Sequence, residues 1–167
     1  MGTGADLPSD QDREGGGVKA PVLVSACLLG VDCRYNGRNC LDERVRRLAK
    51  RMTLIPVCPE QLGGLGTPRP PVRIIGGSGS DVLDGRAMVV DEGGADVTER
   101  MLRGARQVLR LAKVLRVGSA IMKARSPSCG CGEIEGEGGA VVAGDGVTSA
   151  LLKREGIRVI TEEELKE

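Results

Sequence analysis

Short, continuous runs of apolar residues alternate along the chain with segments of helical periodicity, and this alternation limits the folds available to it. The runs end at Gly, Pro or polar residues, as in VLVSACLLG (22–30) and LIPVC (54–58). Strands that are apolar on both faces are typical of a parallel sheet with helices on both sides. We therefore expect an α/β protein with a mostly parallel sheet covered on both faces and a small antiparallel excursion.

The expected elements follow from these runs and from helix-start and helix-stop signals. Strands are expected at 22–27, 54–58, 119–122, 140–143 and 157–160. Helices are expected at 41–52, from Asp96 or Thr98 to about Arg116, within 144–156 and at 161–167. Segment 71–94 contains two β-branched runs separated by Gly, Ser and Asp, and this pattern predicts the antiparallel excursion.

The length of 167 residues suits a single domain. Residues 1–19 lack apolar periodicity and are rich in Gly, Asp and Glu, so we expect a disordered tail there and one α/β domain over 20–167. The apolar stretches fall short of the roughly 18 residues that a membrane helix needs, and the polar leader does not look like a signal peptide. A soluble, cytoplasmic protein is expected.

Composition excludes several classes of chemistry. The chain has no His, Trp or Phe and a single Tyr, Tyr35, which excludes Ser-His-Asp triads, histidine-ligated zinc and multi-aromatic platforms for base stacking. Lys and Arg total 24 against 23 Asp and Glu, so a formal charge of +1 gives no broad attraction to membranes or nucleic acids. We expect no membrane partner and no stable nucleic-acid binding, and we interpret the arginines of the long helix as a solvated face.

Six cysteines remain as the main source of chemistry. In a reducing cytosol, clustered thiols more often bind metal or handle sulfur than form disulfides, although a free cysteine is also a common buried residue. Cys27, Cys58 and Cys129 each lie at or just past the end of an expected strand. Because ligands of open parallel sheets bind outside the carboxyl ends of the strands, these three thiols are expected to meet at one edge.

The spacing of these cysteines does not match a zinc ribbon or a ferredoxin run, because the chain contains no CxxC pair. Three soft thiolates suit an iron–sulfur cluster, and a cubane held by three cysteines keeps one iron without a protein ligand. Such an iron is a Lewis acid. Glu60, two residues beyond Cys58, is a carboxylate placed to manage proton transfers, although a helix-cap or surface role is the common one for such a residue.

Four motifs of the chain are long enough to be compared with known families: VSACLLGVDCRYNG, PVCPEQLGGLGTPRPP, KARSPSCG and GDGVTSALL. Together, over roughly residues 20–165, they resemble the domain family that includes the iron–sulfur-dependent thiouracil desulfidases. The resemblance implies a [4Fe-4S] cluster and a non-redox removal of sulfur from a small thiolated nucleobase or nucleoside, with release of sulfide. It implies Cys27, Cys58 and Cys129 as cluster ligands, Glu60 as the acid–base residue, and Ser126 as a hydroxyl that orients substrate or relays a proton.

Three cysteines are left over, and alternatives remain open. Any of Cys33, Cys40 and Cys131 can in principle close the fourth coordination position; we interpret Cys33 as a local structural or protective thiol and favour Cys129 over Cys131 from its motif position. Lys123 and Arg125 are candidates for meeting an anionic substrate or sulfide. The alternative functions are a cofactor-free sulfurtransferase that uses a cysteine persulfide and a non-catalytic metal-binding or redox-sensing domain.

Overall fold

A computed structural model describes residues 19–167, so the tail expected over residues 1–19 lies outside the described residues except for Lys19. The centre of the fold is a sheet of four parallel strands in the order β2-β1-β5-β8. The strands are β1 (Pro21–Ser25), β2 (Thr53–Val57), β5 (Ser119–Met122) and β8 (Arg158–Thr161). The two central strands, β1 and β5, are buried on both faces, and in β1 Val22 and Leu23 point to opposite sides with neither exposed. In the edge strand β2 only Val57 is buried.

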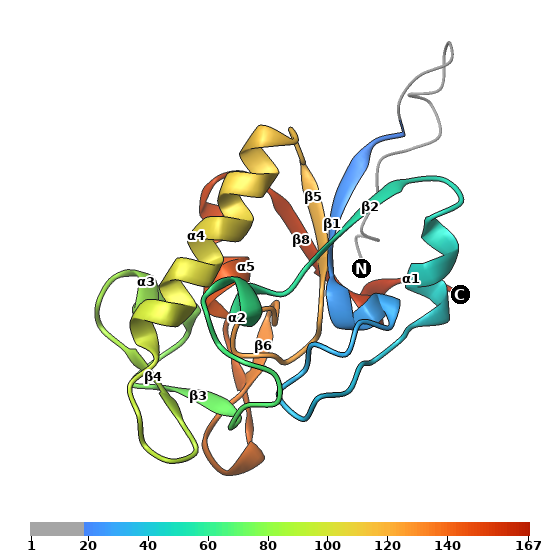
Figure 1. The fold of residues 1–167 in the computed structure, drawn as a ribbon. Helices are drawn as coiled ribbons and strands as arrows, with labels where there is room; N and C mark the ends of the chain where they lie inside the picture. The colour runs from blue at the N-terminus through green and yellow to red at the C-terminus, as the bar shows by residue number, and fades with distance from the viewer. Residues whose placement is uncertain (1–18) are drawn as a thin grey trace.

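Helices cover both faces of this sheet, as the sequence predicts. In Figure 1 the sheet stands between α1 (Glu43–Leu48) on one side and α4 (Thr98–Val114) on the other, and α5 (Val147–Arg154) packs beside α4. Val45 of α1 joins the cluster on one face, and Val108 of α4 and Leu152 of α5 join the cluster on the other. None of the helices in residues 19–167 has the length and apolar character needed to cross a membrane.

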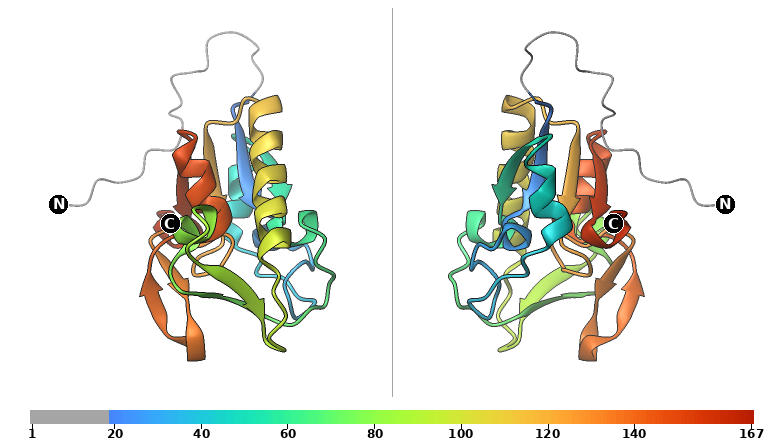
Figure 2. Two further views of the ribbon diagram at one scale, coloured as in Figure 1. Left: turned by 90° about the vertical axis from the view of Figure 1, so that its left-hand side faces the viewer. Right: turned by 90° about the vertical axis from the view of Figure 1, so that its right-hand side faces the viewer.

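Two antiparallel hairpins extend beyond one end of the sheet (Figure 2). The first pairs β3 (Val72–Ile75) with β4 (Met88–Asp91), which confirms the antiparallel excursion predicted for segment 71–94. The second pairs β6 (Glu133–Glu135) with β7 (Val141–Ala143). Only β7 is predicted by sequence, because β6 alternates Glu and Ile over three residues and shows no apolar run.

Several short helical elements differ from the expected boundaries. The first strand ends at Ser25, and Cys27 lies in the following 3₁₀ helix η2 (Ala26–Leu29) rather than at the strand end. The expected C-terminal helix is the single turn η4 (Glu162–Glu164), and helices α2 (Pro59–Leu62) and α3 (Gly79–Leu83) occupy segments that the sequence presents as loop. The remaining short turn is η3 (Glu137–Gly139). Elements of three to five residues are too short to show helical periodicity.

The long helix α4 begins with Thr98, and its N-cap residue is neither Asp96 nor Thr98, the two residues that the sequence predicts for this position. Val97 occupies the N-cap position, and the Asp96 carboxylate accepts a hydrogen bond from the Thr98 amide at 2.9 Å. The Thr98 hydroxyl instead accepts from the Val89 amide at 2.9 Å and so ties the start of α4 to β4. The hairpin and the long helix are therefore fixed to each other at the end of the molecule where the site lies.

Candidate functional site

A cavity of about 520 Å³ lies where β2, β1 and β5 end and the two hairpins begin. Cys27 follows β1, Cys58 directly follows β2, and Cys129 lies in the loop after β5. These three strands are neighbours in the sheet, so their carboxyl ends bring the three thiols to one cavity. The structure thus brings together all three cysteines that the sequence places at strand ends, and Cys129, not Cys131, is the member of its pair that lines the cavity.

Cys33 is a fourth thiol in the same cavity. It is 2 % exposed, and it lines the cavity together with Cys27 and Cys58. The Cys58 Sγ atom also lies 3.7 Å from the carbonyl oxygen of Cys33. Cys33, interpreted from the sequence as a local structural or protective thiol, therefore lies among the three expected ligands. The spacing of the cysteines in the sequence does not indicate this position.

Cys40 and Cys131 lie outside this cavity. Cys40 is half-buried and packs against the cluster of apolar side chains beneath α1. The Cys131 thiol donates to the carbonyl oxygen of Val159 at 3.4 Å. Four of the six cysteines therefore surround the cavity and two do not.

The local environment favours the neutral form of three cavity thiols, those of Cys33, Cys58 and Cys129. The hydrogen bond with Cys27 and burial raise the pKa of Cys33 to about 11, and the hydrogen bond with Cys33 and burial raise the pKa of Cys58. Burial raises the pKa of the Cys129 thiol to about 12. Because the thiolate and not the thiol is the good nucleophile, the raised pKa values make these three side chains poor nucleophiles at neutral pH.

The loop that carries Cys129 is held from two sides. The Ser126 Oγ atom accepts hydrogen bonds from the amides of Ser128 and Cys129, each at 3.2 Å. On the other side the Ser149 hydroxyl donates to the Cys129 carbonyl at 2.6 Å. Gly146 makes this packing possible, since a Cβ atom there would lie 2.8 Å from the Cys129 amide nitrogen. Ser126 therefore lines the cavity and also shapes the turn that presents Cys129.

Glu60 is the second residue of α2 and lines the cavity. Its Oε2 atom accepts two hydrogen bonds from Arg69, from Nη2 at 2.5 Å and from Nε at 3.1 Å. The side chains are 14 % and 6 % exposed, so this is a largely buried ion pair. No hydrogen bond from residues 19–167 reaches the Oε1 atom, which leaves one carboxylate oxygen available.

Two glycines fix α2, and with it Glu60, against α4. A Cβ atom on Gly104 would overlap the carbonyl oxygen of Pro59, and one on Gly63 would overlap the carbonyl oxygen of Arg100. Both contacts require the backbones of the two helices to touch. The position of Glu60 is therefore set by helix packing as well as by its ion pair.

Lys123 and Arg125 also line the cavity, but both already have acidic partners. Lys123 Nζ lies 2.6 Å from an oxygen of Glu162, and Arg125 Nη2 lies 2.6 Å from an oxygen of Glu163. Glu162 is itself buried and accepts a further hydrogen bond from the Ala124 amide at 2.8 Å. These cations tie the loop after β5 to the C-terminal turn, so less of their charge is available for an anionic substrate.

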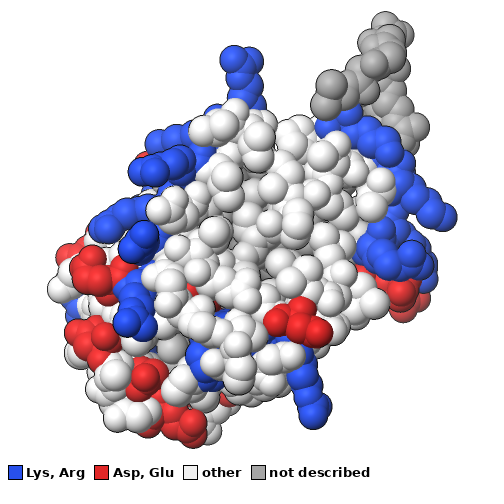
Figure 3. All heavy atoms as spheres, viewed as in Figure 1, with Lys and Arg blue, Asp and Glu red and all other residues white. Residues whose placement is uncertain are grey.

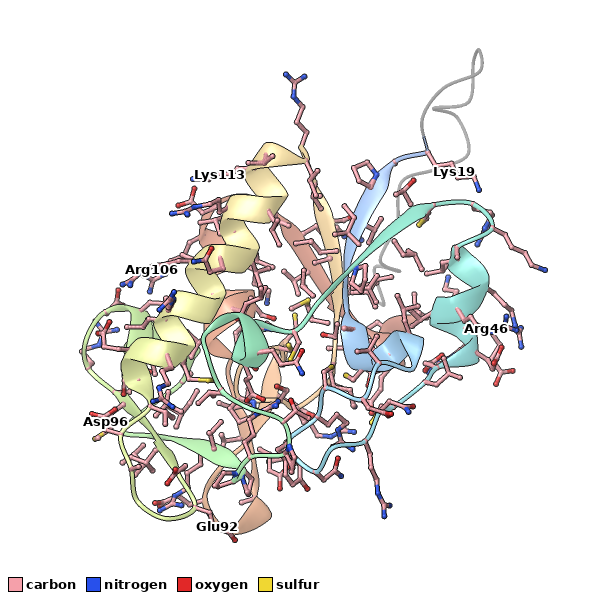
Figure 4. The ribbon with its side chains drawn as sticks, viewed as in Figure 1. Lys19, Arg46, Glu92, Asp96, Arg106 and Lys113 are labelled. Carbon is pink, nitrogen blue, oxygen red and sulfur yellow. The ribbon has the colours of Figure 1, made fainter. Side chains whose placement is uncertain are left out.

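The arginines of α4 do not line the cavity and are exposed to solvent, as the sequence predicts for this face of the helix. Lys and Arg side chains line the α4 side of the molecule in Figure 3. Arg106 and Lys113 point outward from the helix in Figure 4, and Arg100, Arg103 and Arg110 are exposed as well.

Sequence reasoning missed Arg69 and the position of Cys33. Arg69 lies nine residues after Glu60 in the segment GLGTPRPP, and that segment has neither helical nor strand periodicity to place its side chain. The only available signal is chemical: a carboxylate expected in a buried site needs a cationic or hydrogen-bonding partner. Several nearby arginines satisfy that condition equally well in the sequence.

Comparisons with known proteins agree with this geometry. A family model described as 2-thiouracil desulfurase matches residues 22–164. An uncharacterised protein of Bacillus subtilis (strain 168), YbbK, is 47% identical over 148 residues, which cover 87% of this chain and 98% of that protein. Among solved structures, the [4Fe-4S]-dependent thiouracil desulfidase TudS is similar, with a TM-score of 0.76, 39% sequence identity, and coverage of 88% of this chain and 93% of that one.

Proposed function

This chain belongs to the 2-thiouracil desulfurase family, and we propose that it removes sulfur from a small thiolated nucleobase or nucleoside. The thiocarbonyl becomes a carbonyl and the sulfur leaves as sulfide. The observation that carries the proposal is the meeting in one cavity of the Glu60 carboxylate and three thiols from the segments that follow β1, β2 and β5. The similarity to a thiouracil desulfidase over most of both chains supports it.

Cys27, Cys58 and Cys129 are proposed to hold a [4Fe-4S] cluster. Their donor set fits it, because soft thiolates from separate elements surround one cavity that contains no imidazole and is about 520 Å³ in volume. When bound by three cysteines, such a cluster supplies a Lewis-acidic iron that attracts the thiocarbonyl sulfur. In this assignment Cys33 is a free thiol beside the ligands.

Glu60 is proposed to handle the protons. The net reaction adds one water to the thiocarbonyl compound and yields the carbonyl compound and hydrogen sulfide, so atoms balance and no electrons are exchanged. As the carbon–oxygen bond forms, the water must lose protons, and as the carbon–sulfur bond breaks, the sulfide must gain them. The Glu60 Oε1 atom can accept a proton from the water and return it to the sulfur.

Ser126 is proposed to act through orientation. Its hydroxyl oxygen accepts hydrogen bonds from two backbone amides, and the hydroxyl group also lies 3.2 Å from the Ser128 hydroxyl. The hydroxyl proton can therefore point toward Ser128 or into the cavity. In the second orientation it can donate a hydrogen bond to a polar atom of a bound base.

The test is desulfurisation of 2-thiouracil by anaerobically purified and reconstituted protein. We expect uracil and sulfide in equal amounts, with no added reductant or sulfur acceptor, and no product from the iron-free protein. Uracil is measured by chromatography and sulfide by a colorimetric assay. Formation of a cysteine persulfide on the iron-free protein from a persulfide donor, whose outer sulfur is already at the required oxidation level, would support the sulfurtransferase instead. An iron-loaded protein that releases no sulfide from any thiolated base would contradict the proposal.

A further inference from the structure

The guanidinium group of Arg69 is the most fully hydrogen-bonded cation of the cavity. Besides its two bonds to Glu60, Nη2 donates to the Cys33 carbonyl at 2.9 Å. Nη1 donates to the Gly66 carbonyl at 3.1 Å and to the Thr67 hydroxyl at 3.0 Å. These five contacts match the five N–H donors of a guanidinium group, so Arg69 has no donor left for a substrate.

These contacts connect two parts of the site that are distant in sequence. Cys33 lies in the loop after η2, whereas Glu60 belongs to α2. The backbone amide of Arg69 also donates to the Tyr35 carbonyl at 2.8 Å, which ties its own segment to the Cys33 loop. One side chain therefore fixes the distance between the loop of a cavity thiol and the cavity carboxylate.

We propose that Arg69 is a positioning residue for Glu60, an inference that rests on the proposed function. By occupying Oε2 with two hydrogen bonds, Arg69 fixes the rotation of the carboxylate and leaves Oε1 as the oxygen that exchanges a proton. A planar fork can do this and an ammonium group cannot, because lysine offers a point charge without two donors in fixed geometry. Arg69 acts through Glu60 and does not touch the reacting atoms.

The experiment compares Arg69→Lys, Glu60→Gln and the double variant, each reconstituted anaerobically. Arg69→Lys should lower kcat for 2-thiouracil by roughly 10- to 100-fold, the usual loss when a catalytic group is misplaced by about 1 Å. KM should stay within about twofold because Arg69 has no donor for substrate, and iron content should be unchanged. In the Glu60→Gln background the same change should cost less than about twofold, because residues that act as a unit are not additive.

A crystal structure of the Arg69→Lys protein gives a readout independent of activity. The Glu60 carboxylate should be displaced or disordered, and a carboxylate that keeps its place would overturn the proposal even if the chain proves inactive on 2-thiouracil. Arg154→Lys is the matched control, since Arg154 forms a two-contact ion pair with Asp84 at 2.9 and 3.0 Å outside the cavity. It should leave turnover unchanged.

The remaining outcomes separate this role from the proposed function. Normal kcat in Arg69→Lys, together with a large loss in Glu60→Gln, would overturn the role of Arg69 alone. An equal loss from Arg69→Lys in both backgrounds, or loss of iron, would also overturn it and give Arg69 a role in supporting the Cys33 loop. Full turnover in Glu60→Gln would overturn the proton-transfer role of Glu60 and, with it, the positioning role of Arg69.

Discussion

Replacing Gly104 by alanine tests whether the contact between α2 and α4 holds Glu60 in place. The added Cβ atom would overlap the Pro59 carbonyl oxygen and lie 2.8 Å from its carbonyl carbon. Alanine gains about 1 kcal/mol over glycine in a helix interior, whereas overpacking costs about 1–3 kcal/mol. Because the obstructing atoms are backbone and cannot rotate away, the upper half of that range applies, and the net loss is about 1–2 kcal/mol.

For a chain of this size, this loss corresponds to a fall in Tm of roughly 2–8 °C. The helices must separate, so Glu60 moves by about an ångström and turnover falls by up to roughly 100-fold. Thermal unfolding followed by circular dichroism measures the first effect, with all proteins in the same metal state. Gly118→Ala is the control, because an added Cβ there meets no atom within 4 Å. A Gly104→Ala protein at least as stable as the wild type would refute the reasoning.

Two further substitutions test the acid–base residue and a helix cap. Glu60→Gln keeps the shape of the side chain but cannot take up a proton, so iron content should be retained while turnover falls by roughly 10²- to 10⁴-fold; near-normal turnover with full iron would contradict the assignment. Asp42 caps α1 by accepting from the Arg44 amide at 2.8 Å, and Asp42→Ala should cost about 1 kcal/mol in urea unfolding at neutral pH. The hydrogen bond from the Arg44 side chain holds the pKa of Asp42 below its ordinary value of 3.8, so the cap's contribution is present above that pH and is lost as the pH falls through the lower folded value. A difference between wild type and Asp42→Ala that stays constant into acid would contradict this account of the cap.

The parallel sheet was predictable because its central strands, β1 and β5, are buried on both faces. A strand in that position is rich in apolar residues, as in β5, where Ala120, Ile121 and Met122 are all buried, and such runs are visible in a single sequence. The convergence of Cys27, Cys58 and Cys129 followed from the same signal, since parallel strands place their carboxyl ends at one edge. The hairpin strand β6 was missed because its pattern extends over only three residues.

The inner arrangement of the site was not predictable, because it depends on loops packing against each other. Cys33 lies in a loop beside the cavity, and its own carbonyl oxygen accepts a hydrogen bond from Arg69, which is 36 residues away in sequence. The pairing of Glu60 with Arg69 depends in turn on the path of the GLGTPRPP segment. Hydrogen bonds of this kind have no periodic trace in the sequence, so residue type alone cannot choose the partner.

The assignment of the ligands is tested most directly by iron and acid-labile sulfide content per chain in single cysteine variants reconstituted without oxygen. Cys27→Ser, Cys58→Ser and Cys129→Ser should each lose the cluster, because a hydroxyl group is a poor replacement for a thiolate on iron. Cys33→Ser, like Cys40→Ser and Cys131→Ser, should retain about four iron and four sulfide per chain. Loss of iron in Cys33→Ser with full retention in any of the three proposed ligand variants would contradict the account.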